Sequence, residues 1–339
     1  RLKSVKAILT IKLTAYHRPI SICFVGKKLF LIFNKMFTIS PWLEHVVMLA
    51  QGQIMALRTY TTNHQVFIMN KFMNARVSEL IDVDSLLPKF ETLKACWKEK
   101  DVRINKLLRS RDDEARSLAE KLSECNEEEP CYSLACPECV RLLRLRKISQ
   151  LTRFCEDYTE WKAATFIYYD EMARVLKRQD IVRLKDRLRK QLDRAGVKDI
   201  VIGFFEVDYQ SEYQRWMPHF HLLVRCKDSH SPQWERLRKV FANQSPPINV
   251  NVRKRRPVLF QKFKDPLQQI AYICKFMWQR VEARYNEEGN RLTKKYRLSN
   301  GKFVDSLLML DSLKLADLEF MYEVRQYGAT LQESVRGKR

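Results

Sequence analysis

The chain has 339 residues, with 62 Lys and Arg against 40 Asp and Glu, which gives a formal net charge of +22. Its 45% hydrophobic content and only 8 glycines exclude a low-complexity chain and predict a globular protein with one large core or two modest domains. The excess of positive charge indicates a polyanionic partner, nucleic acid first, although a solvated cationic surface would have the same composition.

The cysteine and hydropathy patterns favour a reducing, cytoplasmic setting. Nine cysteines, an odd number at uneven spacing, do not match a disulfide framework. The apolar stretch 20–33 is interrupted by Lys27 and Lys28 and is too short to cross a bilayer, so we expect no transmembrane segment. The sequence has no phosphate-binding loop of the G-x-x-x-x-G-K-[ST] type, so any helicase would act in trans.

The basic segment 1–78 differs in composition from the rest of the chain. It holds eleven Lys or Arg and a single acid, Glu44, whereas both signs mix freely after it. A basic start before an apolar run also occurs in signal peptides, but no small-residue cleavage site follows it here. We assign this segment no function.

The remainder divides into four predicted regions. Residues 79–124 are charged and rich in helix formers, which predicts a helical arm, and a cysteine-rich element follows at 125–160. From 161 to 283 the hydrophobic period switches between two and 3.6, which predicts strands and helices in the order β-α-β-β-α-β, at residues 163–169, 181–192, 199–207, 217–225, 231–243 and 248–253.

The expected fold is therefore α+β, with a ferredoxin-like, RRM-like split antiparallel sheet. Asp265, followed by proline and then by Gln268, predicts the start of a further helix, which carries Tyr272. We expect residues 284–339 to form a helical accessory region.

Two histidines share one face of the third predicted strand. Side chains alternate along a strand, so His219 and His221 point one way while Phe220 and Leu222 point the other. Two adjacent imidazoles are suited to a divalent metal. The spacing alone fits two hydrogen-bonded structural histidines equally well.

A carboxylate at the end of the second strand completes the candidate site. Strands two and three of a split sheet pair directly, which predicts that Glu206 lies beside His219. Two imidazoles and one carboxylate, with coordination positions left open, would suit Mn²⁺ or Mg²⁺ polarising a phosphate. Asp208 competes with Glu206 for this role, and an ordinary strand-end carboxylate is the alternative.

Tyr272 lies away from the apolar stripe of its predicted helix, beside Gln268 and Lys275. A core tyrosine would lie on the stripe, so this phenol is a candidate nucleophile with a cation one turn away. A partly exposed structural tyrosine would show the same Y-x-x-K spacing. The stripe itself runs through Leu267, Ile270, Ala271, Cys274 and Trp278.

The sequence combines an H-x-H strand with apolar flanks, an upstream Glu206 and a Y-x-x-K helix on one split sheet. This combination resembles the HUH endonuclease superfamily. The likeness is to its single-tyrosine initiators of rolling-circle replication in plasmids and phages. It covers residues 163–280, and the stretch W-M-P-H-F-H-L-L at 216–223 carries most of it. The resemblance implies that His219, His221 and Glu206 bind the metal and that Tyr272, assisted by Lys275, attacks a DNA phosphate.

The same resemblance implies the products and the partners. Nicking of single-stranded or hairpin origin DNA would give a 5′-phosphotyrosine and a free 3′-hydroxyl, and a helicase and a polymerase of the host would act in trans. A transposase or a mobilisation relaxase would use the same chemistry. An alternative of another class is a non-catalytic nucleic-acid-binding module, since RNA-binding domains are built on a similar sheet.

The cysteine-rich element predicts a structural zinc site. Cys136 and Cys139 have the C-P-x-C spacing of a zinc knuckle, Cys131 is the expected third ligand, and Cys125, with Cys155 in reserve, is the fourth. Reduced structural thiols are the alternative. The basic residues that follow suggest a zinc-stabilised DNA-contacting element; they are Arg141, Arg144, Arg146 and Lys147.

A basic run lies between the fourth predicted strand and the tyrosine helix. It consists of Arg253, Lys254, Arg255 and Arg256. We expect these side chains to bind backbone phosphates of DNA, although such a run is often only a solvated loop.

Overall fold

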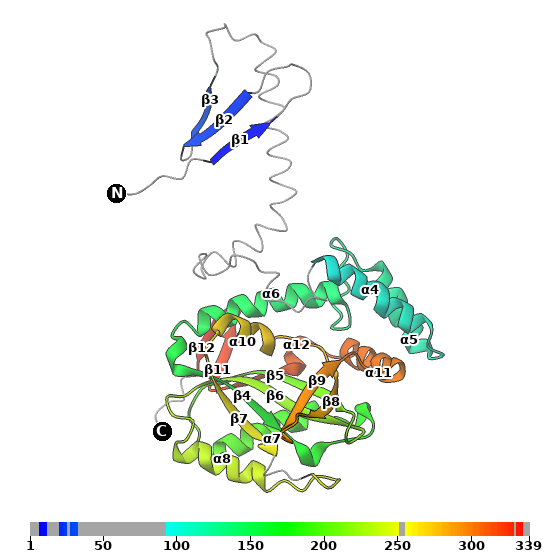
Figure 1. Cartoon of the computed structure of the whole chain (residues 1–339), viewed down its shortest axis with the longest axis vertical. Coiled ribbons are helices and arrows are strands. Elements are labelled where there is room, and N and C mark those ends of the chain that lie inside the picture. Colours follow the sequence, from blue (N-terminus) through cyan, green and yellow to red (C-terminus); the bar gives the residue numbers. More distant parts are fainter. Residues whose placement is uncertain are drawn as a thin grey trace. The chain divides into compact units, whose positions relative to one another are not determined.

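The computed structural model describes residues 7–11, 20–25, 28–32, 93–250, 255–328 and 330–334. They belong to two compact units, which divide between Phe67 and Ile68. In the first unit β1 (Ala7–Ile11), β2 (Ile20–Val25) and β3 (Lys28–Ile32) form an antiparallel sheet (Figure 1). Within the described ranges, no helix is long and apolar enough to cross a membrane.

The second unit is built on a mixed, mostly antiparallel sheet of seven strands. The strands lie in the order β7-β4-β6-β5-β8-β9, and β10 pairs with the beginning of β5. Only β5 and β8 pair in parallel among the described strands. The bounds are β4 (Trp161–Ile167), β5 (Val201–Gln210), β6 (Arg215–Arg225), β7 (Val258–Lys262), β8 (Arg280–Tyr285), β9 (Arg291–Tyr296) and β10 (Glu319–Tyr322).

Helices cover both faces of this sheet, which makes the unit α+β as predicted (Figure 1). On one face lie α7 (Ile181–Ala195) and α8 (Pro232–Ala242), and on the other lie α6 (Pro137–Phe154) and α10 (Pro266–Ile273). Gly196, with a φ of 76°, ends α7 in the left-handed conformation that glycine adopts readily.

The predicted helical arm consists of two helices where it is described. α4 (Leu93–Leu108) packs against α6, and α5 (Asp113–Glu124) packs against α4. The side chain of Asp112 accepts a hydrogen bond from the backbone N–H of Glu114 and so caps the start of α5. Residues 79–92 of the arm lie outside the described part of the chain.

The prediction of a fourth strand at residues 248–253 is wrong. Residues 248–250 are not in a strand, residues 251–254 lie outside the described ranges, and the strand beside β4 is β7. The reason is that Ile248 and Val250 join a separate small apolar cluster with Tyr169 and Met172. Their alternating pattern therefore reflects local packing and not membership of the sheet.

The C-terminal region is also not purely helical. It contains α11 (Asn300–Asp311) and α12 (Leu315–Leu318), but β9 and β10 join the main sheet. A small hairpin of β11 (Val324–Tyr327) and β12 (Thr330–Glu333) follows. Its strands were missed because they are only four residues long and largely exposed, so they show no clear apolar alternation.

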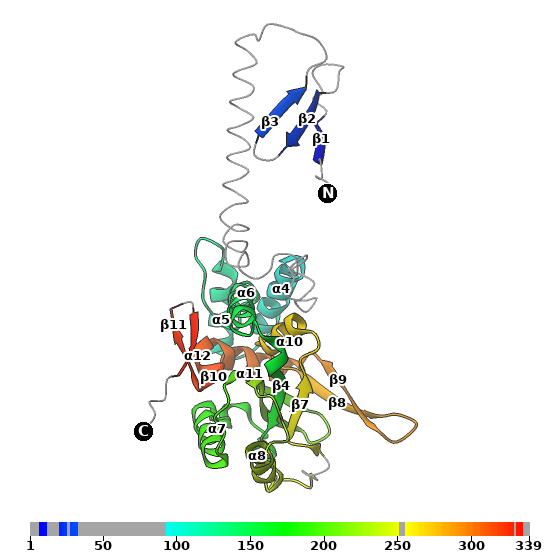
Figure 2. The ribbon, with the colours of Figure 1, turned by 90° about the vertical axis from the view of Figure 1, so that its left-hand side faces the viewer.

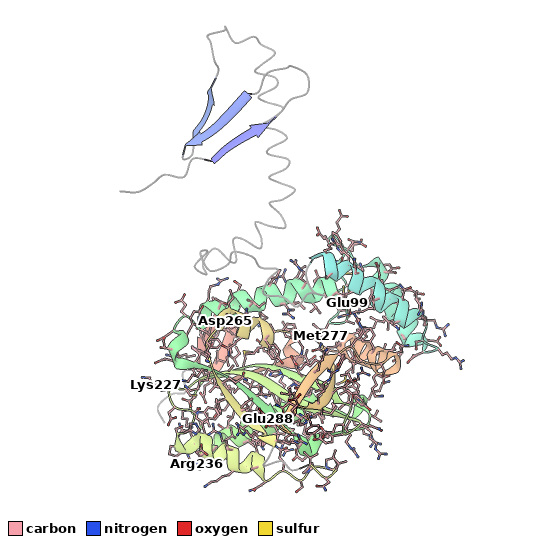
Figure 3. All side chains as sticks on the ribbon, in the orientation of Figure 1. Glu99, Lys227, Arg236, Asp265, Met277 and Glu288 are labelled. Atoms are coloured by element: carbon pink, nitrogen blue, oxygen red, sulfur yellow. The ribbon has the colours of Figure 1, made fainter. Side chains whose placement is uncertain are left out.

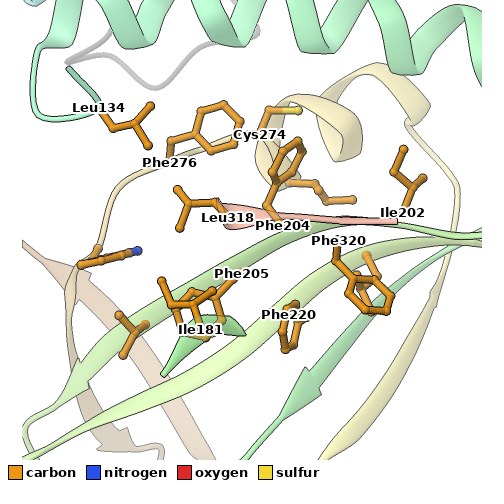
Figure 4. Close-up of a cluster of buried hydrophobic side chains, with 14 of the residues drawn as sticks. Leu134, Ile181, Ile202, Phe204, Phe205, Phe220, Cys274, Phe276, Leu318 and Phe320 are labelled. Carbon is orange, nitrogen blue, oxygen red and sulfur yellow. The ribbon is translucent and has the colours of Figure 1, made fainter. Parts of the chain in front are cut away.

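The core lies on both sides of β5 and β6 (Figure 4). Phe204 and Phe205 are consecutive, so they face opposite sides of the sheet. Phe204 packs edge-to-face on Phe276 near α10, with ring centroids 4.7 Å apart, and Phe205 packs on Phe220 at 5.5 Å. Fully burying one such side chain contributes about 1.5–3 kcal/mol, which holds these strands firmly in register.

Candidate metal and nucleophile site

The pairing of β5 with β6 places the three candidate metal ligands. Glu206 pairs with His219, and Phe204 pairs with His221, in antiparallel register. Because directly paired residues point to the same face of a sheet, the three ligand side chains lie together on the face that α10 covers. They are buried, with exposures of 1% for Glu206, 4% for His219 and 8% for His221.

The donor atoms of these side chains converge on one point. Nε2 of His219 lies 3.2 Å from Nε2 of His221, and each nitrogen lies 3.6 Å from Oε2 of Glu206. Ligands held at about 2.0–2.2 Å from one ion lie roughly 3.0–3.5 Å apart at tetrahedral or octahedral angles. Oε1 of Glu206 is buried and has no hydrogen-bond partner among the described residues, which an ion would supply. The three residues therefore fit a divalent metal.

The other nitrogen of each imidazole has a partner that orients the ring. Nδ1 of His219 lies 3.1 Å from the carbonyl oxygen of Met217, and Nδ1 of His221 lies 3.1 Å from Oγ1 of Thr165. Since a carbonyl oxygen only accepts, Nδ1 of His219 is the donor in this contact, and Nε2 is the atom that faces the site. Burial lowers the pKa of His221 to about 3, so this ring is neutral and suited to bind a metal.

Two lysines neutralise two buried carboxylates. Nζ of Lys275 is 3.1 Å from Oε2 of Glu206, and Nζ of Lys295 is 3.0 Å from Oδ2 of Asp208. Burial acts to raise the pKa of each carboxyl, but the neighbouring cations more than offset it: the pKa of Glu206 lies well below its ordinary value, and that of Asp208 is also lowered. Asp208 further accepts a hydrogen bond from the backbone N–H of Gln279, so Glu206 is the carboxylate that faces the histidines.

Tyr272 lies directly beside this cluster. Asp265 caps the start of α10, where its side chain accepts a hydrogen bond from the backbone N–H of Gln268 (Figure 3). One turn further, Ile270 and Ala271 are buried while Tyr272 keeps 46% of its surface exposed. Its ring meets that of His221 edge-to-face, with centroids 5.1 Å apart. The phenol is thus both accessible and adjacent to the candidate metal site.

The expected position of Lys275 on the tyrosine helix is wrong. The helix ends at Ile273, and a turn in which Phe276 has a φ of 42° carries Lys275 inward to Glu206. Fully buried Arg144 of α6 holds this turn by donating hydrogen bonds of 3.0 Å to the carbonyl oxygens of Ala271 and Lys275. Lys275 still lies 5.5 Å from the ring centroid of Tyr272, but its hydrogen bond goes to the carboxylate.

The contact with the phenolic oxygen is made by a residue that the sequence analysis missed. Nζ of Lys295, on β9, donates a hydrogen bond of 3.2 Å to the hydroxyl of Tyr272. Burial acts to lower the pKa of Lys295, but Asp208 and other negative groups raise it well above its ordinary value, so this side chain is an ammonium. No local motif marks Lys295, since it is 23 residues from Tyr272 and reaches the site only through the sheet.

Tyr168 and Tyr169, at the end of the predicted first strand, are poorly placed for nucleophilic attack. Tyr168 is buried, and its hydroxyl donates a hydrogen bond to Gln191. Tyr169 is buried in the small apolar cluster. Burial raises the pKa of both phenols, which disfavours their phenolate forms. Of these three tyrosines, Tyr272 is the one placed for nucleophilic attack.

Four cysteines form a second candidate metal centre. The sulfur of Cys125 lies 3.6 Å from the sulfurs of Cys136 and Cys139, and the sulfurs of Cys131 and Cys139 are 3.8 Å apart. Four sulfurs held at about 2.3 Å from a tetrahedral zinc are separated by roughly 3.8 Å. The cluster can therefore hold a metal such as zinc, with Cys125 rather than Cys155 as the fourth residue.

The basic residues after this cluster do not form the expected DNA-contacting surface. Arg141, Arg144 and Lys147 are buried, because α6 packs on the sheet and on α10, and only Arg146 of the four is exposed. Lys147 forms a buried ion pair with Glu319 at 2.8 Å. The charged groups of Arg144 and Lys147 therefore make contacts inside the protein.

The second predicted DNA-binding run is described only in part. Arg253 and Lys254 lie outside the described residues. Arg255 pairs with Glu212 at 3.4 Å, and Arg256 is exposed with a φ of 50°. β7 separates the run from the tyrosine helix, so the run does not lead directly into it.

Comparisons with protein-family models, with curated proteins and with solved structures find no match to this chain.

Thr165, whose hydroxyl contacts Nδ1 of His221, allows a test of the cluster of His219, His221 and Glu206. Thr165→Val keeps the shape of the side chain but removes the oxygen that orients the imidazole, and we expect Mn²⁺ affinity to fall by about tenfold. Isothermal titration with Mn²⁺ measures this change. Thr293→Val, at an exposed position on β9, should leave the affinity unchanged. Equal affinity in both variants would contradict the role of Thr165 in orienting His221 for metal binding.

The cysteine cluster is tested by its metal content. Purified protein should carry about one zinc per chain, and Cys136→Ala should remove it, because three thiolates hold zinc far less tightly than four. Cys226→Ala, a buried thiol outside the cluster, is the matched control and should retain the zinc. Elemental analysis that finds no zinc in wild-type protein prepared without chelator would favour four reduced structural thiols.

Proposed function

We propose that this protein is a metal-dependent endonuclease of the HUH type that nicks and rejoins single-stranded DNA through Tyr272. The observation that carries the proposal is the packing of an accessible phenol on His221, one member of a converging cluster of two imidazoles and one carboxylate. A nucleophile, a candidate metal site and two ammonium groups thus lie within a few ångströms of one another.

The residues divide the chemistry among them. His219, His221 and Glu206 would hold Mn²⁺ or Mg²⁺, which supplies a Lewis acid that polarises the phosphate oxygens. The phenolic oxygen of Tyr272 attacks phosphorus, and the bond from phosphorus to the 3′ oxygen breaks. The phenol loses its proton to solvent, and the departing 3′ oxygen takes up a proton from solvent. Lys275 fixes Glu206 and adds positive charge near the attacked phosphate.

The connectivity of the sheet is consistent with this proposal. The segments β4-α7-β5-β6-α8-β7 run in the order β-α-β-β-α-β, with β4 and β6 as the inner strands. We interpret them as a ferredoxin-like unit, to which β8, β9 and β10 are added.

The net charge of +22 favours a nucleic-acid substrate. We further propose that the reaction initiates rolling-circle replication, with helicase and polymerase in trans; transposition and mobilisation would use the same site.

A non-catalytic nucleic-acid-binding module is less well supported. Such domains on a split sheet leave one face open, so that its aromatic side chains can stack on bases. Here α6 and α10 cover the face that carries Phe204, and helices cover the other face as well (Figures 1 and 4). The accessible group beside the buried cluster is the phenol of Tyr272, which favours chemistry over base stacking.

Loss of one hydroxyl tests the proposed nucleophile. Tyr272→Phe should abolish the covalent protein–DNA adduct, while free energy of unfolding changes by less than about 1 kcal/mol, because the side chain is half exposed. The assay mixes protein and Mn²⁺ with a randomised, fluorescently labelled single-stranded DNA library and resolves the adduct on a denaturing gel. Tyr285→Phe, an exposed tyrosine on β8, is the control and should form the adduct normally. An adduct of undiminished yield from Tyr272→Phe would place the nucleophile elsewhere.

A further inference from the structure

The hairpin of β8 and β9 brings a second cation to the proposed nucleophile. β8 continues the sheet beside the end of β5, where Tyr209 pairs with Arg280, and β9 pairs with β8 (Figure 2). Lys295, opposite Val281, lies near the base of the hairpin, whereas its turn extends away from the sheet. The strand pairing therefore fixes the backbone of Lys295 relative to the site.

The side chain of Lys295 has two partners of different kinds. Its Nζ lies 3.0 Å from Oδ2 of buried Asp208 and 3.2 Å from the hydroxyl oxygen of Tyr272. Asp208 is in turn fixed by the backbone N–H of Gln279, 2.8 Å from its other oxygen. The ammonium is thus held on one side by a rigid carboxylate, and it directs another of its three N–H groups at the phenol.

We propose that Lys295 is a catalytic residue of the tyrosine step, which donates a hydrogen bond to the phenolic oxygen and stabilises the negative charge on it while the bond to phosphorus forms or breaks. This inference rests on the proposed function. Asp208 is then a positioning residue, which acts only through Lys295. Lys275 has a different task, because its hydrogen bond goes to Glu206 and it faces the phenol ring at 5.5 Å rather than the oxygen.

The stabilisation of the phenolic oxygen by Lys295 matters most in the rejoining step. There the 3′ oxygen attacks phosphorus, the bond from phosphorus to the phenolic oxygen breaks, and the phenolate leaves beside the ammonium of Lys295. The proton lost by the 3′-hydroxyl then returns to the phenolate through solvent, and Lys295 keeps its own protons throughout. A donor aimed at an atom where charge develops typically accelerates such a step by about 10²- to 10³-fold.

The experiment measures single-turnover nicking and rejoining with the labelled oligonucleotide recovered from the random library, in the presence of Mn²⁺. Lys295→Met should slow both steps by about 100-fold or more, and Lys295→Arg should restore part of the rate. Lys294→Met is the matched control: that ammonium lies over the ring of Tyr296, and the variant should react like wild type. Mn²⁺ affinity should not fall in any of the three variants, because Lys295 bonds to none of His219, His221 and Glu206, and its positive charge does not help to hold a cation.

A second measurement separates charge stabilisation from packing. With 3-fluorotyrosine at position 272 the phenolate is a better leaving group, so the rejoining defect of Lys295→Met should become smaller. An unchanged defect, or a loss of Mn²⁺ affinity in proportion to the loss of rate, would overturn the role. If wild-type protein forms no adduct, the proposed function itself fails; if it does and Lys295→Met reacts at the wild-type rate, only the role of Lys295 fails.

Discussion

The antiparallel register between β5 and β6 is the constraint on which the candidate site depends. It sets Glu206 opposite His219, and a slip by one residue would turn both histidines to the other face of the sheet. Two features of the core prevent a slip. Phe204 and Phe205 fill pockets on opposite faces, and a side chain added at Gly203 would collide with the carbonyl oxygen of His221. The two strands are in close contact at Gly203, and this contact fixes His221 on β6 relative to Glu206 on β5.

The rest of the unit brings parts of the chain that are distant in sequence to this register. Buried Arg144 connects α6 to the turn after α10 through its hydrogen bonds to two backbone carbonyl oxygens. α6 begins within the cysteine cluster, at Pro137. The candidate zinc centre thereby supports α6, the helix whose Arg144 holds the turn that follows Tyr272.

A second connection holds the other side of the site. Glu99 lies on α4 (Figure 3). It accepts bidentate hydrogen bonds of 2.8 and 2.7 Å from Arg297, which directly follows β9, and it also pairs with Arg103. Arg103 in turn donates to the carbonyl oxygen of Ala135, beside the cysteine cluster. The helical arm, the cluster and the strand that carries Lys295 therefore form one polar network around the sheet.

Short-range patterns in the sequence were enough to predict part of this arrangement. Strand alternation puts His219 and His221 on one face, and the pairing of adjacent strands puts Glu206 beside them; both follow from local chain geometry. The exposed position of Tyr272 follows from helical periodicity. Lys295 was not predictable, because its contact depends on which sheet edge the hairpin joins. The buried role of Arg144 was missed for a related reason: a run of basic residues does not reveal which of them will face a neighbouring helix.

Peptide mapping of the adduct tests whether Tyr272 becomes covalently joined to DNA. Wild-type protein incubated with Mn²⁺ and the single-stranded library would be digested with protease and nuclease and then analysed by mass spectrometry. If Tyr272 is the nucleophile, we expect one modified peptide, with a nucleotide linked through its 5′-phosphate to Tyr272. A nucleotide on any other residue, or cleaved DNA without a protein-linked product, would contradict it.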